Sequence, residues 1–435
     1  MNKVKQFFGG DLRQLGMIVV LFGILLFFHI WTGGYIITPD NFDNIINGNA
    51  YILVLAVGMV LVIIAGHIDL SVGSVAAAVG ISVALAMQNW SLPWPVAILF
   101  GLAVGAIIGA WQGLWTAYVG IPAFIVTLAG MLTFRGVNQA IGKSNTVQVP
   151  SDFQKIGSGA LPEVGPFTGY NNLTLLLGVV ACLAIAYGTV AGRRRLTKIG
   201  AQTEESWMTW LRLGVICAVI LGIMFFFASA RTGFPYAGLI LIALVIIYSF
   251  VADRTITGRH IYAVGGNRLA AELSGVKSKR VNFLVMMNMS VLAALAGMMF
   301  DARSGASGPF DGQGWELDAI AAVFIGGAAV SGGVGTVIGS MVGGLVMASL
   351  NNGLYTKGIG ADAQQIIKGL VLLTAVAFDV YSKKQGKPSI TGLLMRNYRS
   401  GRAGDDSGSG GPSAPAGNPA ARETASVKES IGQSS

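Results

Sequence analysis

Charged side chains are scarce in this sequence. Asp, Glu, Lys and Arg make up 11% of its 435 residues, whereas soluble proteins contain about a quarter. Apolar residues make up 53% of the chain. So few charges cannot cover the surface of a soluble protein of this length, and the sequence therefore predicts a membrane protein.

Cysteine is nearly absent as well. The two cysteines, Cys182 and Cys217, both lie within apolar stretches. This excludes a disulfide framework, a zinc site and a haem attachment motif, and it favours a packing role for both thiols. The net charge of +9 does not indicate nucleic-acid binding, because the basic residues are spread between apolar runs rather than clustered on one soluble face.

Long apolar runs dominate the rest of the chain. A helix needs about 20 apolar residues to cross about 30 Å of hydrocarbon. By that measure we predict an all-α fold, a polytopic bundle of about twelve membrane segments. They are 15–31, 51–65, 72–87, 94–119, 122–141, 173–191, 213–228, 235–251, 281–300, 317–330, 334–351 and 363–381. Several are short or rich in glycine, so some are expected to be broken or re-entrant.

The distribution of lysine and arginine predicts which ends lie in the cytoplasm. If the chain starts inside and alternates sides, 22 of the 29 basic residues fall on inner segments and 5 on outer segments. Such an excess is the positive-inside signal, so both termini are expected to be cytoplasmic. The corresponding division is an N-terminal segment 1–14, a transmembrane domain 15–382 and a cytoplasmic tail 383–435.

The N-terminal end of the chain is expected to be a membrane anchor and the C-terminal end a disordered tail. Segment 15–31 follows basic residues, as in a signal peptide, but no small-residue cleavage site follows Trp31, so we expect an uncleaved anchor. Residues 401–435 are rich in Gly, Ser, Ala and Pro and lack aromatic residues. Such a segment cannot bury enough surface to offset its ordering entropy, which predicts disorder.

The loops leave little room for soluble catalytic machinery. The longest are an outer loop at 143–172 and an inner loop at 252–280. Segment 136–144 approaches a phosphate-binding P-loop, but it has five residues between its glycines where four are required, and it follows an apolar helix rather than a strand. We therefore expect neither ATP binding nor catalysis by this chain.

The inner loop carries the most informative stretch of the sequence. Asn267 follows a glycine pair and is a good N-cap, 268–274 reads as a short helix, and Gly275 stands where a helix stop belongs. Such a helix is shorter than the roughly 12–15 residues that are stable alone in water, so it needs something to pack on. An apolar face of Leu269, Ala270 and Leu273 fits a groove in another protein; the alternative is a helix that lies on lipid or on the inner face of its own bundle.

Four ordered motifs carry a family resemblance. They are Ile261-Tyr-Ala-Val-Gly-Gly-Asn267 with Leu273-Ser-Gly275, Gly66-His-Ile-Asp-Leu-Ser-Val-Gly-Ser74, Phe124-Ile-Val-Thr-Leu-Ala-Gly-Met-Leu-Thr-Phe-Arg-Gly136, and Glu316-Leu-Asp-Ala-Ile-Ala-Ala-Val-Phe-Ile-Gly-Gly327 with Ser331-Gly-Gly-Val-Gly335. Together they resemble the permeases of ABC sugar importers of the ribose/xylose/galactose type, over about residues 15–382. The hairpin 173–228, which shorter ribose-type members lack, makes the chain most similar to the xylose and multiple-monosaccharide permeases.

The resemblance implies a permease in a bacterial plasma (inner) membrane. Its expected partners are a second permease copy, a cytoplasmic ABC ATPase and an extracytoplasmic sugar-binding protein. No cofactor is expected on this chain, since ATP and Mg²⁺ belong to the ATPase. The expected ATPase-coupling residues are Gly258, Arg259, Tyr262, Gly265, Gly266, Asn267, Ala270, Ala271, Leu273, Ser274 and Gly275.

Asp69 is the other singular residue. Residues 51–87 are just long enough for two spans with a tight turn, which places Asp69 at the inner edge of the membrane. A carboxylate at mid-bilayer costs about 2.5–3.5 kcal/mol, so its presence needs a reason. One interpretation is that Asp69 and Ser71 cap the following helix; the other gives them a role in an inner gate or in coupling. His67 is interpreted as an interfacial histidine rather than a proton relay.

Further candidates for the transport pathway are less specific. Arg135 is expected either to extend to the membrane surface or to form a salt bridge within the bundle. The glycine-rich run 326–335 indicates close helix packing, a break in a span or unwound backbone beside the pathway. Lys368, Trp111 and Trp115 are interpreted as interface anchors. The full set of pathway or gate candidates is Asp69, Ser71, Arg135, Glu316, Asp318, Gly326, Gly327 and Ser331.

Two other functions remain open at this point. One is a secondary transporter in which Asp69, with His67, exchanges protons. The other is a purely structural membrane protein. The sequence does not tell which sugar an importer of this kind would carry.

Overall fold

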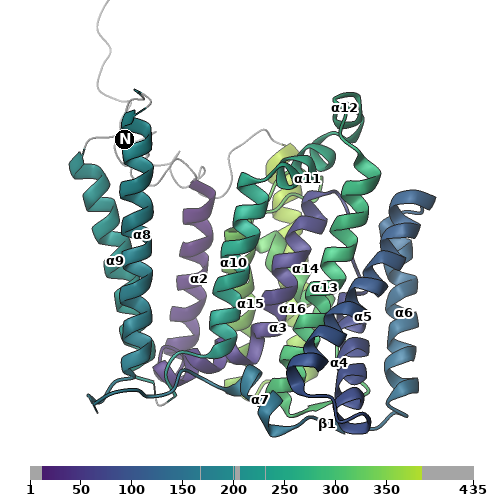
Figure 1. Ribbon diagram of the computed structural model, residues 1–435, viewed down its shortest axis with the longest axis horizontal. Helices are drawn as coiled ribbons and strands as arrows, with labels where there is room; N and C mark the ends of the chain where they lie inside the picture. Colours follow the sequence, from purple (N-terminus) through teal and green to yellow (C-terminus); the bar gives the residue numbers. More distant parts are fainter. Residues whose placement is uncertain (1–11, 167, 199, 201–205, 231, 385–435) are drawn as a thin grey trace, which may run out of the picture. The chain divides into compact units, whose positions relative to one another are not determined.

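The computed structural model describes residues 12–166, 168–198, 200, 206–230 and 232–384, which form helices joined by short connections and one pair of very short strands (Figure 1). The predicted segment 1–14 and the tail 383–435 lie almost wholly outside these residues. The elements are α2 (Leu12–Trp31), α3 (Pro39–Ile64), α4 (Val72–Asn89), α5 (Trp94–Leu114), the π-helix η1 (Trp115–Val119), α6 (Ala123–Ile141), β1 (Val147–Gln148), α7 (Ser151–Ser158), α8 (Asn172–Lys198), α9 (Ser206–Ala228), α10 (Tyr236–Arg254), α11 (Ile256–Gly266), α12 (Arg268–Leu273), α13 (Ser278–Ser304), β2 (Ala306–Ser307), α14 (Trp315–Ile325), α15 (Val337–Thr356) and α16 (Ala361–Lys384).

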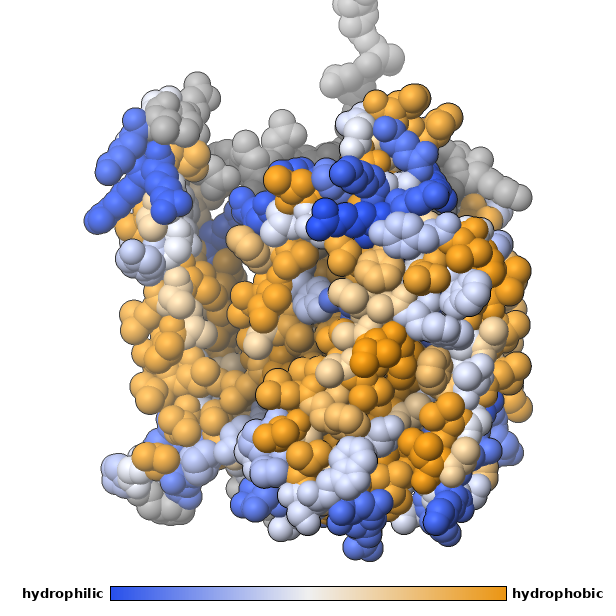
Figure 2. Space-filling model, turned by 45° about the vertical axis from the view of Figure 1, so that its right-hand side comes forward, coloured by the Kyte–Doolittle hydropathy of each residue, from blue (hydrophilic) through white to orange (hydrophobic). Residues whose placement is uncertain are grey.

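Each predicted membrane segment coincides with a helix. Within the described ranges, nine helical segments are both long and apolar enough to cross a membrane. On the face that Figure 2 shows, apolar residues cover the middle of the molecule and hydrophilic residues gather toward both ends. The fold is therefore that of a helical, multi-pass membrane protein.

One predicted span is broken. The expected segment 317–330 is represented by α14, which has only 11 residues and is about 16 Å long. A crossing needs about 30 Å, so α14 cannot span the bilayer alone. It ends at Gly326, and the glycine-rich loop that follows leads into α15. This confirms the expectation that some of the segments are interrupted.

The helix α3 begins twelve residues before the predicted span 51–65. Thr38 caps it and Pro39 occupies its first turn, a position where a missing N–H costs nothing. Four polar residues in this extension, Asn41, Asp43, Asn47 and Asn49, are buried. Asn41 and Asn352 of α15 exchange amide hydrogen bonds of 3.0 and 3.2 Å, and Asn351 donates to Asn49 over 3.3 Å. Pairing across two helices thus explains amides that look like a loop in the sequence.

A stripe of glycines fixes α5 against α13. Gly101, Gly105, Gly109 and Gly113 recur every four residues along α5. A Cβ atom on any of them would come within 2.6–3.0 Å of atoms in α13. Small residues at this spacing let two helix backbones approach closely, which is a common way to pack helices in a membrane.

The hairpin α8–α9 is the segment that suggested the xylose type of permease. It packs on α3 through Phe42, whose ring meets those of Phe226 and Phe227 edge-on at 5.7 and 6.2 Å. Cys182 and Cys217 are free thiols that face each other between the two helices, with Cys182 Sγ 3.7 Å from the carbonyl oxygen of Cys217. Both residues are half-buried, and their packing role stays a prediction.

Two small features were not predicted. The helix α7 lies inside the expected outer loop 143–172, and β1 pairs with β2 in an antiparallel register in which Val147 faces Ser307. Both lie at the end of the bundle opposite α11 and α12 (Figure 1). The all-α prediction therefore holds apart from this single pair of two-residue strands.

Candidate functional site

The short helix of the inner loop is present as α12. Asn267 precedes it in an extended conformation, and its Oδ1 atom accepts a hydrogen bond from the backbone N–H of Ala270 over 3.0 Å. Gly275 follows with a φ of +86°, the left-handed conformation that favours glycine at a helix end. The predicted cap and stop are confirmed, and the six-residue helix ends at Leu273.

Two leucines give α12 an exposed apolar patch beside the charged pair of Arg268 and Glu272. The side chains of Leu269 and Leu273 are 68% and 82% exposed, and Ala270 and Ser274 are exposed beside them. Ala271 is instead buried and packs inward. The helix is therefore not lodged in its own bundle, and its two leucines are free to meet another surface.

The helix α11 was not predicted, because the segment before α12 was interpreted as loop. Thr255 caps its N-terminus by accepting from the backbone N–H of Gly258 over 3.2 Å. Its residues Gly258, Ile261 and Val264 are buried against the bundle, whereas Arg259 is exposed. Gly258 and Ala271 thus lie on the inward side of the loop, and their part in coupling stays a prediction.

Tyr262 ties α11 to the glycine-rich loop that follows α14. Its hydroxyl donates a hydrogen bond to the carbonyl oxygen of Gly335 over 2.7 Å. Burial, and next the negative charge of Asp253, raise the pKa of Tyr262 to about 12. The phenol therefore stays a neutral donor at physiological pH, and this contact does not depend on pH in that range.

Gly265 is the closest point between α11 and the membrane helices. A Cβ atom at this position would lie 1.6 Å from the carbonyl oxygen of Ile64, the last residue of α3. The same carbonyl accepts the backbone N–H of Gly333 over 2.8 Å. Gly266 next to it has open space and is exposed. The end of α3, the glycine-rich loop and α11 therefore meet at one point.

Glu272 connects the short helix α12 to the start of α13 by hydrogen bonds. Its carboxylate accepts from the hydroxyl of Ser278 and from Arg268 Nε, the latter over 2.9 Å. These two hydrogen bonds, that of Ser278 first, lower the pKa of Glu272 below its usual range. Glu272 therefore remains ionised at physiological pH and connects α12 to the start of α13.

Asp69 lies in the break between α3 and α4. Its Oδ1 accepts both the backbone N–H and the hydroxyl of Ser71, over 2.8 and 2.6 Å. Ser71 makes no capping bond to the helix; its hydroxyl accepts from Gln112 Nε2 of α5 over 2.7 Å. The expected double cap is thus wrong for Ser71. Gln112, which sequence reasoning missed, completes the set.

The expected position of Asp69, at the inner edge of the membrane, is corrected as well. Ser71 lies against Gly130, which is about two turns into α6, and both Asp69 and Ser71 have no exposed surface. The segment therefore runs into the bundle rather than along the membrane edge. The unpaired oxygen Oδ2 of Asp69 is buried there without a hydrogen-bond partner among the described residues.

The N-termini of α4 and α14 meet inside the bundle. A Cβ on Gly73 would lie 2.0 Å from the carbonyl oxygen of Gly312 and 2.8 Å from Glu316 Oε2. Glu316 is buried, and Arg135 of α6 lies close enough for the two charges to attract. The structure thus favours the interior position for Arg135, which is half-buried, over extension to the membrane surface.

Asp318 is the second carboxylate at the start of α14. It forms a salt bridge of 2.9 Å with Lys368 of α16, and the two side chains are 7% and 26% exposed. Lys368 was interpreted as an interface anchor, and that interpretation is wrong. Trp111 and Trp115, the other proposed anchors, are 43% and 38% exposed at the end of α5.

The remaining candidates lie at the other end of α14. Gly326 ends that helix, Gly327 follows with a φ of +84°, and Ser331 is exposed in the loop beyond. The eleven residues of α14 separate them from Glu316 and Asp318. The structure therefore divides the predicted pathway set in two. One group, Asp69, Ser71, Glu316, Asp318 and Arg135, lies around the N-termini of α4 and α14. The other group, Gly326, Gly327 and Ser331, lies at the C-terminal end of α14, where Gly326 packs against α15 and Gly327 against Met17 of α2. Over the described residues, no group of three or more His, Cys, Asp or Glu side chains could hold a metal ion.

Comparison with known proteins identifies the family. The model of a family described as the permease component of the branched-chain amino acid transport system matches residues 41–376. This is more than half of the chain, which therefore belongs to that family of transport permeases. No solved structure matches the chain.

Several curated proteins are similar over most of their length. The xylose transport system permease protein XylH of Haemophilus influenzae is 36% identical over 376 residues, which cover 86% of this chain and 98% of that protein. XylH of Escherichia coli K12 is 38% identical over 86% of this chain and 93% of its own length. The ribose import permease protein RbsC of the same strain is 33% identical over 80% of this chain and 87% of its own length. The resemblance seen in the motifs is thus confirmed.

Proposed function

We propose that the chain is the transmembrane permease subunit of an ATP-binding cassette importer that moves a monosaccharide into the cell. The observation that carries the proposal is α12, a capped helix of six residues whose two leucines are largely exposed outside the membrane helices. A helix this short is not stable alone, so an exposed apolar face on it favours a docking partner. The names of XylH and RbsC support xylose, or a related pentose or hexose, as the cargo.

The orientation follows from charge. The basic residues at the end of α8, in α11 and in α12 lie at one end of the bundle, where α11 and α12 protrude (Figure 1). We assign this end, and with it both chain termini, to the cytoplasm, because short loops rich in Lys and Arg stay inside. A cytoplasmic ATPase then meets α12, and an extracytoplasmic sugar-binding protein meets the end that carries α7. A second permease copy completes the pathway, and hydrolysis of ATP takes place on the ATPase.

The exposed face of α12 gives the direct test. In proteoliposomes with the ATPase and the sugar-binding protein, Leu273→Asp is expected to lower sugar-stimulated ATP hydrolysis to the basal rate, because a carboxylate would be desolvated at the docking surface. Leu273→Met keeps an apolar side chain of similar volume and is expected to retain at least half of the stimulation. Full stimulation of the Asp variant would contradict the proposal.

A proton-coupled secondary transporter is the second candidate, and the unpartnered Oδ2 of Asp69 is the observation that favours it. In the importer, the role of Asp69 is structural, because its Oδ1 accepts two hydrogen bonds from Ser71. The side-chain oxygen of an asparagine can accept the same two hydrogen bonds. We therefore expect Asp69→Asn to keep uptake within about tenfold of the parent, since even a lost neutral hydrogen bond would cost only about 0.5–1.5 kcal/mol. Uptake of labelled sugar with and without a protonophore measures this. Loss of uptake in both the variant and the protonophore-treated parent would favour proton coupling.

A further inference from the structure

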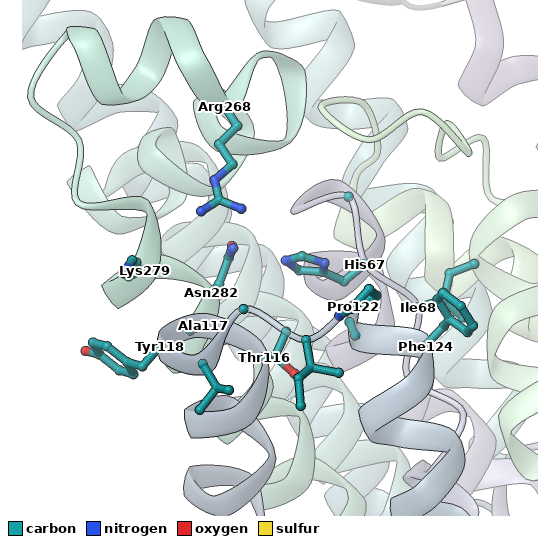
Figure 3. Close-up of a pocket in the computed structure, with 15 residues that line it drawn as sticks. His67, Ile68, Thr116, Ala117, Tyr118, Pro122, Phe124, Arg268, Lys279 and Asn282 are labelled. Atoms are coloured by element: carbon teal, nitrogen blue, oxygen red, sulfur yellow. The ribbon is translucent and has the colours of Figure 1, made fainter.

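A cavity of about 520 Å³ opens beside α12 at the basic end of the bundle (Figure 3). Its walls come from parts of the chain that are far apart in sequence. They are the turn after α3 at His67, the turn from η1 into α6, and the segment from α12 to the start of α13. The inner-loop function described above does not use this cavity.

The charge of the lining is entirely positive. Arg268 and Lys279 both line the cavity, and no Asp or Glu is among its lining residues. Arg268 gives its Nε to Glu272, which leaves its two terminal nitrogens without a partner among the described residues. Figure 3 shows this guanidinium directed into the cavity, above Asn282 and His67. Such a lining attracts an anion.

A buried hydroxyl deeper in the cavity has no partner. Thr116 is 8% exposed, and its Oγ1 lacks a hydrogen bond among the described residues. The side chains of His67 and Asn282 lie within reach of each other beside it. Leaving a buried polar atom without a partner costs about 1–3 kcal/mol, so the Thr116 hydroxyl favours an occupant that can form a hydrogen bond.

Two exposed aromatic side chains line the cavity. Tyr118 in η1 and Phe124 in the first turn of α6 are 51% and 56% exposed and lie on opposite sides of it (Figure 3). Both belong to candidate membrane spans. An occupant that fills this site therefore combines a negative charge, a hydrogen-bonding group and an apolar part.

We propose that the cavity binds the headgroup of phosphatidylglycerol, an anionic phospholipid that carries free hydroxyls. The phosphate lies between Arg268 and Lys279, a glycerol hydroxyl forms a hydrogen bond with Thr116, and the acyl chains follow Tyr118. Basic pockets between membrane helices on the cytoplasmic side are suited to anionic headgroups. Because the lipid contacts α12, α13 and η1 at once, it links the inner loop to the membrane helices.

Lipid retention tests the proposal without reference to transport. The purified permease is titrated with phosphatidylglycerol or phosphatidylethanolamine, and bound lipid is measured by native mass spectrometry. Lys279→Gln is expected to weaken phosphatidylglycerol binding about fivefold, the effect of one basic residue near an anionic surface. Arg280→Gln removes the same charge from the neighbouring exposed residue, which does not line the cavity, and is expected to leave binding unchanged. Equal losses in the two variants would overturn the site.

A second variant tests recognition of the hydroxyls. Thr116→Val keeps the shape of the side chain and removes its hydroxyl, so it is expected to reduce the preference for phosphatidylglycerol over phosphatidic acid, which has no glycerol headgroup. An unchanged preference would contradict the placement of the headgroup.

A competition experiment distinguishes a lipid from a soluble phosphate ester. Soluble glycerol 1-phosphate is added to the lipid-bound permease. If it displaces the lipid at micromolar concentration, the site takes a free phosphate ester and the lipid assignment is wrong. Binding of phosphatidylethanolamine as tight as that of phosphatidylglycerol would also overturn it.

Discussion

Gly265→Ala is expected to abolish sugar-stimulated ATP hydrolysis and uptake while basal hydrolysis by the ATPase persists. The new methyl group would lie 1.6 Å from the carbonyl oxygen of Ile64, and a backbone atom at the end of a packed helix cannot move aside as a flexible side chain can. The contact between α11 and α3 would therefore open. Hydrolysis and uptake measured together in proteoliposomes check this.

The neighbouring glycine supplies the matched control. A methyl group on Gly266 would have no other atom within 4 Å, so Gly266→Ala is expected to retain at least half of the parent's stimulation. Amounts of permease in the membrane should be equal for both variants, which separates loss of coupling from loss of folding. Normal stimulation in Gly265→Ala would show that α11 does not need its close approach to α3.

Lys368→Met is expected to have the largest effect on stability. Lys368 is the cation that balances Asp318, whose side chain is 7% exposed. Removing one partner of a buried ion pair leaves an uncompensated charge and costs about 3–5 kcal/mol. The melting temperature of the purified permease, followed by tryptophan fluorescence, should therefore fall steeply.

Neutralising the other partner distinguishes charge from packing. In the double variant Lys368→Met, Asp318→Asn no charge is left buried, so we expect more than half of the lost stability to return. A double variant as unstable as Lys368→Met alone would mean that the lysine acts through its packing rather than its charge.

Local signals account for what the sequence predicted well. The apolar runs located the membrane helices, and the short-range chemistry of Asn267 and Gly275 located both ends of α12. Each of these depends on neighbours within a few residues. The helix α11 was missed because Gly258, Gly265 and Gly266 lower helix propensity, and packing against α3 and the glycine-rich loop stabilises it instead.

Long-range pairing accounts for what could not be predicted. Asn41 meets Asn352, and Asp318 meets Lys368, across separations of 311 and 50 residues. Nothing in a single sequence reports such a pair. The same is true of Gln112 of α5, which donates a hydrogen bond to the hydroxyl of Ser71. The sequence predicted that this hydroxyl would cap α4 instead. The candidate site was thus predicted where it is local and missed where separate helices build it.

The shared contact of α11 has a mechanical consequence. Through Gly265 it abuts the end of α3, and through Tyr262 it is bonded to the loop between α14 and α15. The first contact lies at the connection between α3 and α4, and the second lies in the loop that follows the short helix α14. A displacement of α12 that tilts α11 is therefore expected to reach both connections at once, so that α11 transmits one movement to two separate pairs of membrane helices.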